Sequence, residues 1–171
     1  IILSTCVSNI NDIDLAIKTI KKFHKKIVIL KCVSEYPARY NELNLDDISI
    51  FKKKFRFPVG FSDHTIGSHA AMVASAIGAT VFEKHFKLDN DYKSIDNQFS
   101  MPISKLKDYR HCINSGKEMI RGENKHYKKY IEKKKRISNR SLYISKNIKK
   151  GEILTQNHVK SVRPGLSIHP K

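Results

Sequence analysis

Hydrophobic and polar positions follow two alternating patterns over residues 1–120. Short apolar runs rich in β-branched residues, typical of buried parallel strands, occupy residues 1–3, 27–30, 59–61 and 80–86. After each run, apolar residues recur at helical spacing, which predicts helices over residues 13–23, 46–55, 69–77 and 103–120. This alternation predicts an α/β fold built from parallel βαβ units with right-handed crossovers.

Two architectures fit this alternation: half of an eight-stranded (β/α)8 TIM barrel, or a small open sheet. Polar residues follow the carboxyl ends of the predicted strands at Ser4, Ser34, Ser62 and His85. Barrel active sites are assembled at that end of the strands. The chain also begins within a predicted strand and without a leading Met, as expected of a segment of a longer protein. We therefore expect residues 1–120 to form the C-terminal half of a barrel.

The pattern changes beyond residue 120. Residues 121–139 are polar, charged and without clear periodicity, so we interpret them as a basic linker or a weak helix. Short apolar stretches then return at 142–144, 153–154 and 159–162, separated by turn residues. Because too few apolar residues follow to close a core, we expect residues 140–171 to be the truncated start of a small β-rich domain.

Composition excludes several classes of protein. With 40% hydrophobic residues the chain can bury a core, so disorder is not expected. No apolar run approaches the roughly 20 residues of a membrane-spanning helix, and no signal peptide is recognisable, so we expect no membrane partner. The three cysteines are widely separated and form neither a metal-binding pair nor a disulfide framework, which favours the reducing cytoplasm.

The net charge of +17 raises the alternative of a basic module that binds a polyanion. The excess of Lys and Arg is densest between residues 121 and 150. These basic runs have no interleaved aromatic residues and match no nucleic-acid-binding motif. We interpret them as solvated helix faces and expect no nucleic-acid partner. Salt dependence would distinguish the two interpretations, because binding to phosphate backbones weakens as ionic strength rises.

Two histidines are candidate metal ligands. His64 and His85 end successive predicted strands, so their side chains would meet at the same mouth of a barrel. Two neutral imidazoles suit a divalent transition metal, and a site with only two protein nitrogens would be open and catalytic. The alternative is that both are ordinary histidines at strand ends, and spacing alone does not exclude it.

Hydroxyl and carboxylate side chains accompany the histidines. Ser34, Tyr36 and Ser62 lie beside the same predicted mouth, where hydroxyl groups and strand-end amides hold phosphate or carboxylate oxygens. Loops between strands and helices are rich in serine in any case, so each hydroxyl alone indicates little. Asp96 follows the last predicted strand and either binds sugar hydroxyls or caps a turn.

Six segments, in order and spacing, resemble the sialic acid synthase family. They are 32–38 (CVSEYPA), 58–67 (PVGFSDHTIG), 78–86 (GATVFEKHF), 140–143 (RSLY), 148–152 (IKKGE) and 162–165 (VRPG). The resemblance covers nearly the whole chain. It implies a TIM-barrel synthase domain followed by the start of an antifreeze-like (β-clip) domain. One departure is Cys6, which stands where the family usually has Gly.

The resemblance implies an enzyme that condenses phosphoenolpyruvate with an N-acylated amino sugar to give a nine-carbon sialic-type acid and phosphate. It implies that His64 and His85 hold a divalent metal, Mn²⁺ or Mg²⁺, which polarises the aldehyde of the open-chain sugar. It also assigns substrate contacts in a domain-swapped homodimer. The residues that match these contacts are Ser34, Tyr36 and Ser62 for phosphoenolpyruvate, Asp96 for the sugar, and Arg163 for the sugar of the partner subunit.

The branch of the family is indicated by three short segments. Residues 94–97 (SIDN) replace the Gly-Pro-Asp-His of sialic acid synthases proper, whereas 99–101 (FSM) and 166–171 (LSIHPK) resemble pseudaminic acid synthases. The expected acceptor is therefore 2,4-diacetamido-2,4,6-trideoxy-altrose. The alternative is an N-acetylneuraminate or legionaminate synthase that uses an N-acetylmannosamine-type sugar. A keto-sugar-phosphate synthase would lack the antifreeze-like segment.

The family's lysines and glutamate that act on phosphoenolpyruvate, or as acid and base, match nothing in this chain. The resemblance places them in a preceding half of the barrel, so the main catalytic acid and base are not assigned here. Half a barrel leaves strand edges unpaired and core surface exposed. We therefore expect the isolated 171-residue chain to be poorly soluble or inactive.

Overall fold

The computed structural model describes residues 1–88, 94–121 and 124–170. The chain divides into two compact units, Ile1–Arg121 and Gly122–Lys171, and each is described by itself. Within the described residues, no helix has both the length and the apolar character needed to cross a membrane.

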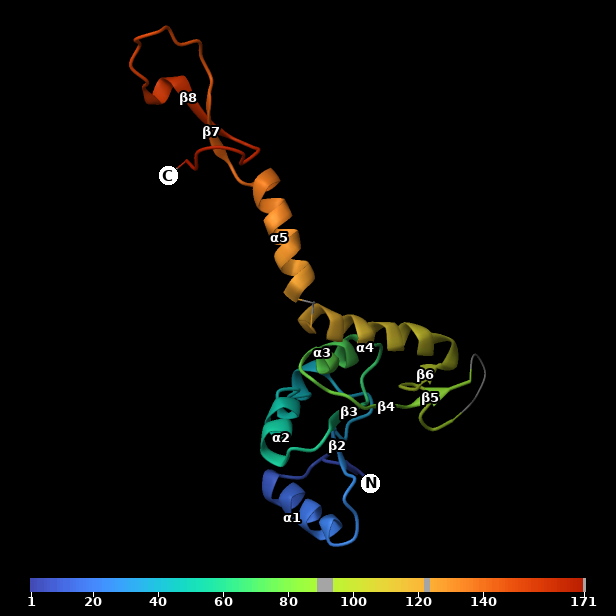
Figure 1. Ribbon diagram of the computed structural model, residues 1–171. Helices are drawn as coiled ribbons and strands as arrows, with labels where there is room; N and C mark the ends of the chain where they lie inside the picture. Colours follow the sequence, from blue (N-terminus) through green and yellow to red (C-terminus); the bar gives the residue numbers. More distant parts are fainter. Residues whose placement is uncertain (89–93, 122–123, 171) are drawn as a thin grey trace. The chain divides into compact units, whose positions relative to one another are not determined.

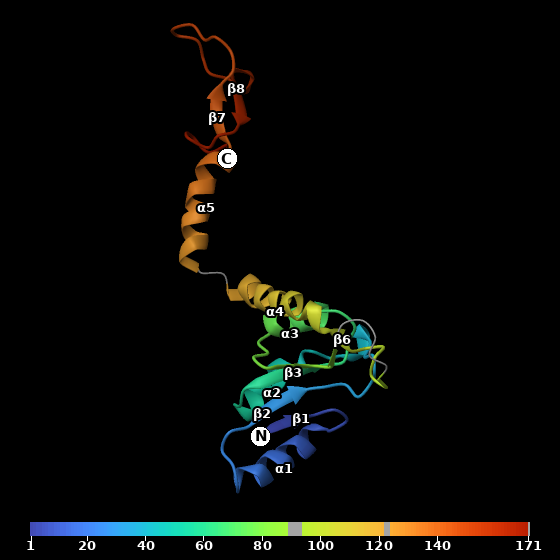
Figure 2. The same ribbon diagram turned by 90° about the vertical axis from the view of Figure 1, so that its right-hand side faces the viewer.

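A four-stranded parallel sheet forms the centre of the first unit (Figure 1). Its strands lie in the order β1-β2-β3-β4. Their bounds are Ile2–Ser4, Val28–Lys31, Val59–Asp63 and Phe82–Lys84. Figure 2 shows β1, β2 and β3 side by side. The predicted α/β fold and its four strands are therefore present, in the order that successive βαβ units produce.

One helix follows each strand of this sheet. The helices are α1 (Ile10–Lys21), α2 (Asp47–Phe55), α3 (His69–Ala76) and α4 (Leu106–Arg121). Helix α1 begins earlier than the apolar periodicity predicts, because the side chain of Asn9 accepts hydrogen bonds from the first-turn amides. Short 3-10 turns at Tyr40–Glu42 and Ile103–Lys105 precede α2 and α4.

The core lies between the sheet and the first helices. Ile29 and Phe61 of the sheet and Ile48 of α2 have no measurable exposure. Helices α3 and α4 lie side by side in both views (Figure 1; Figure 2). They approach so closely that a Cβ atom on Gly116 would lie 2.1 Å from the carbonyl oxygen of Met72. Glycine at this position therefore permits the close packing of the two helices.

The predicted strand over residues 80–86 is interrupted. Strand β4 ends at Lys84, and after His85 a separate strand, β5 (Phe86–Lys87), pairs in parallel with β6 (Met101–Pro102). Sequence patterns did not predict β6, which has only two residues. The amide of Met101 donates to the carbonyl oxygen of His85 at 2.9 Å, so the paired strands begin at this histidine.

The second unit combines a helix with a hairpin. Helix α5 (Asn124–Ser138) occupies most of the segment expected to be a basic linker or weak helix. Strands β7 (Ser141–Ile144) and β8 (Val159–Val162) pair antiparallel, and a 3-10 turn at Gln156–His158 precedes β8. The apolar pair at 153–154 lies outside any strand. The expected β-rich start therefore consists of one hairpin among the described residues.

Candidate active site at the carboxyl ends of the strands

His64 and His85 lie together at the carboxyl edge of the sheet. Asp63 of β3 pairs in register with Lys84 of β4, so the next residue of each strand is a histidine. The centroids of the two imidazole rings are 5.4 Å apart. The sequence prediction that the two side chains meet therefore agrees with the arrangement in this structure.

His64 is 5% exposed, and hydrogen bonds fix its ring. Its Nδ1 lies 2.7 Å from the carbonyl oxygen of Val33, which can only accept, so Nδ1 carries the proton. Its Nε2 lies 3.3 Å from the hydroxyl of Ser62, and that hydroxyl donates to Glu83 Oε1 at 2.6 Å. Because the hydroxyl proton is directed at the carboxylate, Nε2 of His64 retains a lone pair for a ligand.

The imidazole ring of His85 also has an oxygen partner at Nδ1, which is the carboxylate of Asp96. Its Nδ1 lies 3.4 Å from Asp96 Oδ2, and a carboxylate in this position favours a proton on Nδ1. The side chain of His85 is 35% exposed, so it is more open than His64. Asp96 also lies within a described turn, where its carbonyl oxygen accepts from the amide of Ser100 at 3.0 Å. Both interpretations of Asp96, site residue and turn residue, are therefore compatible with its contacts.

Two aromatic rings surround the histidines. The ring of Tyr36 lies 4.1 Å from that of His64 and 5.6 Å from that of His85, measured between centroids. Phe99 lies 5.2 Å from His85 and 5.1 Å from Tyr36. Burial is the main cause that raises the pKa of the Tyr36 phenol, and nearby thiols and carboxylates raise it further. Phe99 was not among the predicted site residues, because an aromatic residue in a loop has no periodic signal.

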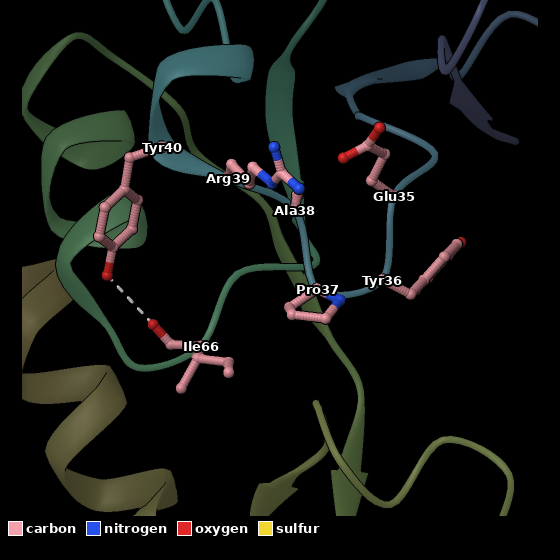
Figure 3. Close-up of a pocket in the computed structure, with 7 residues that line it drawn as sticks. All are labelled: Glu35, Tyr36, Pro37, Ala38, Arg39, Tyr40 and Ile66. Carbon is pink, nitrogen blue, oxygen red and sulfur yellow. Dashed lines mark hydrogen bonds between the residues drawn. The ribbon is translucent and has the colours of Figure 1, made fainter.

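Two hollows border this cluster. One has a volume of about 680 Å³ (Figure 3) and is lined by Glu35, Tyr36, Pro37, Ala38, Arg39, Tyr40 and Ile66. Within it, the Tyr40 hydroxyl donates to the carbonyl oxygen of Ile66 at 3.2 Å. A hydrogen bond with the Glu42 carboxyl is the largest cause that raises the pKa of Glu35. The other hollow, of about 340 Å³, is lined by His85, Phe86, Lys87, Leu88, Ser94, Asp96 and Ser100. The second hollow provides space for a small polar molecule beside His85, and the first is lined by Tyr36, whose ring contacts that of His64.

A buried polar network supports the opposite face of the same strands. Asp63 Oδ1 accepts from the amide and hydroxyl of Thr65 at 2.9 and 2.7 Å. Asp63 Oδ2 accepts from the Tyr109 hydroxyl at 3.0 Å and from Lys84 Nζ at 3.1 Å. Lys84 Nζ also donates to the carbonyl oxygen of Thr65. Burial, followed by the charge of Asp63, raises the pKa of Tyr109 far above its ordinary value.

The remaining predicted residues lie at different positions. Ser62 is 2% exposed within the cluster, whereas Ser34 is exposed in the loop after β2. Arg163 is exposed directly after β8, in the second unit. The described parts of the chain contain no group of three or more His, Cys, Asp and Glu side chains suited to a metal ion. A metal here would therefore use two imidazoles from these residues.

The fold defines the class of the protein: it is an α/β protein whose parallel sheet brings two imidazoles together at its carboxyl edge. The sequence model of the NeuB family matches residues 1–125. The chain therefore belongs to the NeuB family, in agreement with the resemblance to sialic acid synthases.

Three relatives show where the chain lies within this family. It is 41% identical over 145 residues to a pseudaminic acid synthase of Campylobacter jejuni, covering 85% of this chain and 42% of that protein. It is 35% identical to the pseudaminic acid synthase of Helicobacter pylori, covering 100% and 51%. It is 37% identical to the N,N'-diacetyllegionaminic acid synthase of Campylobacter jejuni, covering 98% and 51%. The chain spans about half the length of these curated relatives.

Solved structures share the fold. The N-acetylneuraminic acid synthetase of Leptospira borgpetersenii, in complex with citrate, matches with a TM-score of 0.67 and 28% identity, covering 77% of this chain and 48% of that one. The spore coat polysaccharide biosynthesis protein SpsE of Bacillus subtilis matches with a TM-score of 0.66 and 27% identity, covering 98% and 51%. Both structures cover residues from the first unit of this chain.

Proposed function

We propose that the protein to which this chain belongs condenses phosphoenolpyruvate with an N-acylated amino sugar. The observation that carries this proposal is the pair of neighbouring imidazoles, His64 and His85, each with Nδ1 directed at an acceptor. Membership of the NeuB family and similarity to three nonulosonate synthases support it. In this reaction the enol carbon attacks the sugar aldehyde, water adds at the adjacent carbon, and phosphate leaves by carbon–oxygen cleavage.

The proposed cofactor is a divalent cation, Mn²⁺ or Mg²⁺, held by two imidazole nitrogens of the described residues, of which Mg²⁺ is the less suited to nitrogen ligands. A hydrogen bond engages Nδ1 of His64 and the Asp96 carboxylate lies beside Nδ1 of His85, which leaves Nε2 of each imidazole as the proposed ligand atom. Such a cation would polarise the aldehyde oxygen of the open-chain sugar as a Lewis acid. The contribution of the chain is to hold both rings in place, with Nδ1 of each directed at its oxygen partner.

The other side chains of the cluster have proposed roles toward the two substrates. Ser34, Tyr36 and Ser62 contact phosphoenolpyruvate. The hydroxyl groups of Ser34 and Tyr36 are exposed and can donate to it, whereas the Ser62 hydroxyl donates to it only after turning from the Glu83 carboxylate. Asp96 is half-exposed, and its carboxylate accepts from sugar hydroxyls while it orients His85. Arg163 contacts the sugar bound by the partner subunit of a domain-swapped homodimer. A guanidinium group suits an acidic, hydroxyl-rich substrate.

We also infer the architecture of the whole protein. The parallel sheet, in which β1 and β4 are the outer strands among the described residues, corresponds to half of a (β/α)8 barrel. The hairpin of β7 and β8 corresponds to the start of an antifreeze-like domain. The length of the relatives supports this inference, because the chain covers 42–51% of them.

The proposed acceptor is 2,4-diacetamido-2,4,6-trideoxy-altrose, which gives pseudaminic acid. The 41% identity to a pseudaminic acid synthase supports this choice over the alternative, an N-acetylneuraminate or legionaminate synthase with an N-acetylmannosamine-type acceptor. The chain is also 37% identical to a legionaminic acid synthase, so the N-acetylmannosamine-type acceptor is the one to test beside the altrose sugar.

The test is release of phosphate from phosphoenolpyruvate by the full reading frame that contains this chain. The two amino sugars are offered separately, with Mn²⁺ and then with a chelator. We expect release with the altrose sugar only, lost with chelator and in His64→Ala, but retained in His111→Ala, whose side chain is exposed on α4. Absence of release with either sugar from folded, metal-loaded protein would contradict the proposal.

A further inference from the structure

Two cysteines meet beside the candidate site. Sγ of Cys6 lies 3.2 Å from Sγ of Cys32, and the thiol of Cys6 donates to it. The sheet places them together. Ser4 of β1 pairs with Leu30 of β2, and each cysteine lies two residues beyond this pair, Cys6 in a turn after β1 and Cys32 directly after β2.

The backbone that carries Cys6 is held against β2. The amide and the hydroxyl of Thr5 both donate to the carbonyl oxygen of Leu30, each at 3.0 Å. The amide of Ser8 donates to the carbonyl oxygen of Thr5 at 2.7 Å, which closes a tight turn around Cys6. Cys6 has a φ of 25°, in the left-handed region that favours glycine. Cys6 therefore carries a side chain at a backbone conformation that favours glycine, and its thiol contacts the thiol of Cys32.

Access and reactivity differ between the two thiols. Cys6 is exposed, whereas Cys32 is 1% exposed. An oxidant from solvent therefore reaches Cys6 first, and Cys32 is placed to attack the oxidised sulfur. The sulfur atoms need to approach by roughly 1.2 Å to reach the bond length of about 2.0 Å. Because hydrogen bonds of Thr5 and Ser8 hold the backbone around Cys6, side-chain rotation would have to supply most of this movement.

We propose that Cys6 and Cys32 form a reversible oxidation site for hydrogen peroxide or another hydroperoxide. The Cys6 thiolate attacks a peroxide oxygen, the oxygen–oxygen bond breaks, and the released hydroxide takes up a proton as water, leaving a sulfenic acid on Cys6. The Cys32 sulfur then attacks Cys6 Sγ, and the displaced hydroxide takes the proton of the Cys32 thiol as a second water. Two thiols lose two electrons to one peroxide, and a cellular thiol reductant restores them.

The site adjoins the histidine pair but does not depend on its function. Cys32 Sγ lies 4.0 Å from Nδ1 of His64, so the disulfide would form against the ring that the proposed function uses. Transient disulfides of this kind are the form that redox-sensing cysteines take in a reducing compartment. Formation of the bond is detected by mass and needs no catalytic activity, so its failure and the failure of the proposed synthase are separate outcomes.

The test treats the full reading frame with hydrogen peroxide after removal of reductant, alkylates the remaining thiols and analyses the digest by mass spectrometry. We expect a linked pair of peptides that contains Cys6 and Cys32, reversed by dithiothreitol, while Cys112 is alkylated. Cys112→Ser should retain the link. Cys6→Gly, which suits the positive φ and should fold, should lose it. Conversion of Cys6 to a sulfinic or sulfonic acid with Cys32 still alkylated, or full alkylation of both, would overturn the proposal.

Discussion

Lys84 Nζ lies 3.1 Å from Asp63 Oδ2, and the two side chains are 6% and 0% exposed. These residues directly precede His85 and His64, and they are register partners in β4 and β3. Successive side chains of a strand point to opposite faces. The ion pair therefore joins the two strands on one face at the level where the two histidines meet on the other.

Replacement of Asp63 by Asn should destabilise the protein. The amide keeps the shape of the side chain but leaves the ammonium of Lys84 buried without a counter-charge, which costs about 3–5 kcal/mol. The free energy of unfolding of the full reading frame in urea measures this cost. Asp14→Asn is the matched control, because the Asp14–Lys18 pair is exposed and such pairs contribute less than about 1 kcal/mol. An equal loss of unfolding free energy in the two variants would show that the buried pair contributes no more to stability than the exposed pair.

The Tyr109 hydroxyl should make stability fall in alkaline solution. Burial and the Asp63 carboxylate raise the pKa of Tyr109, so the folded protein keeps a proton that the unfolded chain releases near pH 10. The stabilisation is thus fully present below about pH 10 and declines above it by up to about 1.4 kcal/mol per pH unit. Tyr109→Phe lacks this titration, so its free energy of unfolding should fall less steeply. Parallel curves for the two proteins in urea titrations across this range would contradict the prediction.

Asp96→Asn should weaken binding of Mn²⁺. An amide at this position no longer places a negative charge beside Nδ1 of His85, and loss of such a partner lowers metal affinity by about 10–100-fold. Titration of Mn²⁺ followed by the electron paramagnetic resonance of the unbound ion measures the affinity without sugar. Asp14→Asn serves again as the control. Unchanged affinity in Asp96→Asn would show that the carboxylate does not orient this imidazole.

The parts of this fold that the sequence predicts are those set by local pattern. Apolar runs located all four strands of the central sheet, and the ends of two of them located the histidines. Helix α5 was less distinct, because its Lys and Glu residues favour helices intrinsically but leave little apolar periodicity. Its extent became clear only from the structure.

Contacts between distant segments could not be predicted in this way. Tyr109 reaches Asp63 across 46 positions of sequence, and only the packing of α4 on α3 brings them together. Phe99 reaches His85 through a turn, and β6 is a strand only because β5 pairs with it. A two-residue strand carries no periodicity, so its identification requires knowledge of its partner.

The pairing of β5 with β6 has a consequence for how the site can diversify. Phe86 of β5 pairs with Met101 of β6, and the Met101 amide donates to the carbonyl oxygen of His85. These contacts hold the turn that carries Asp96 and Phe99 next to His85. Under the proposed function, substitutions at Asp96 and Phe99 would change the surface beside His85 while the histidines keep their places in the sheet. Synthases with different acceptor sugars would then be expected to differ at these positions more than in β3 and β4.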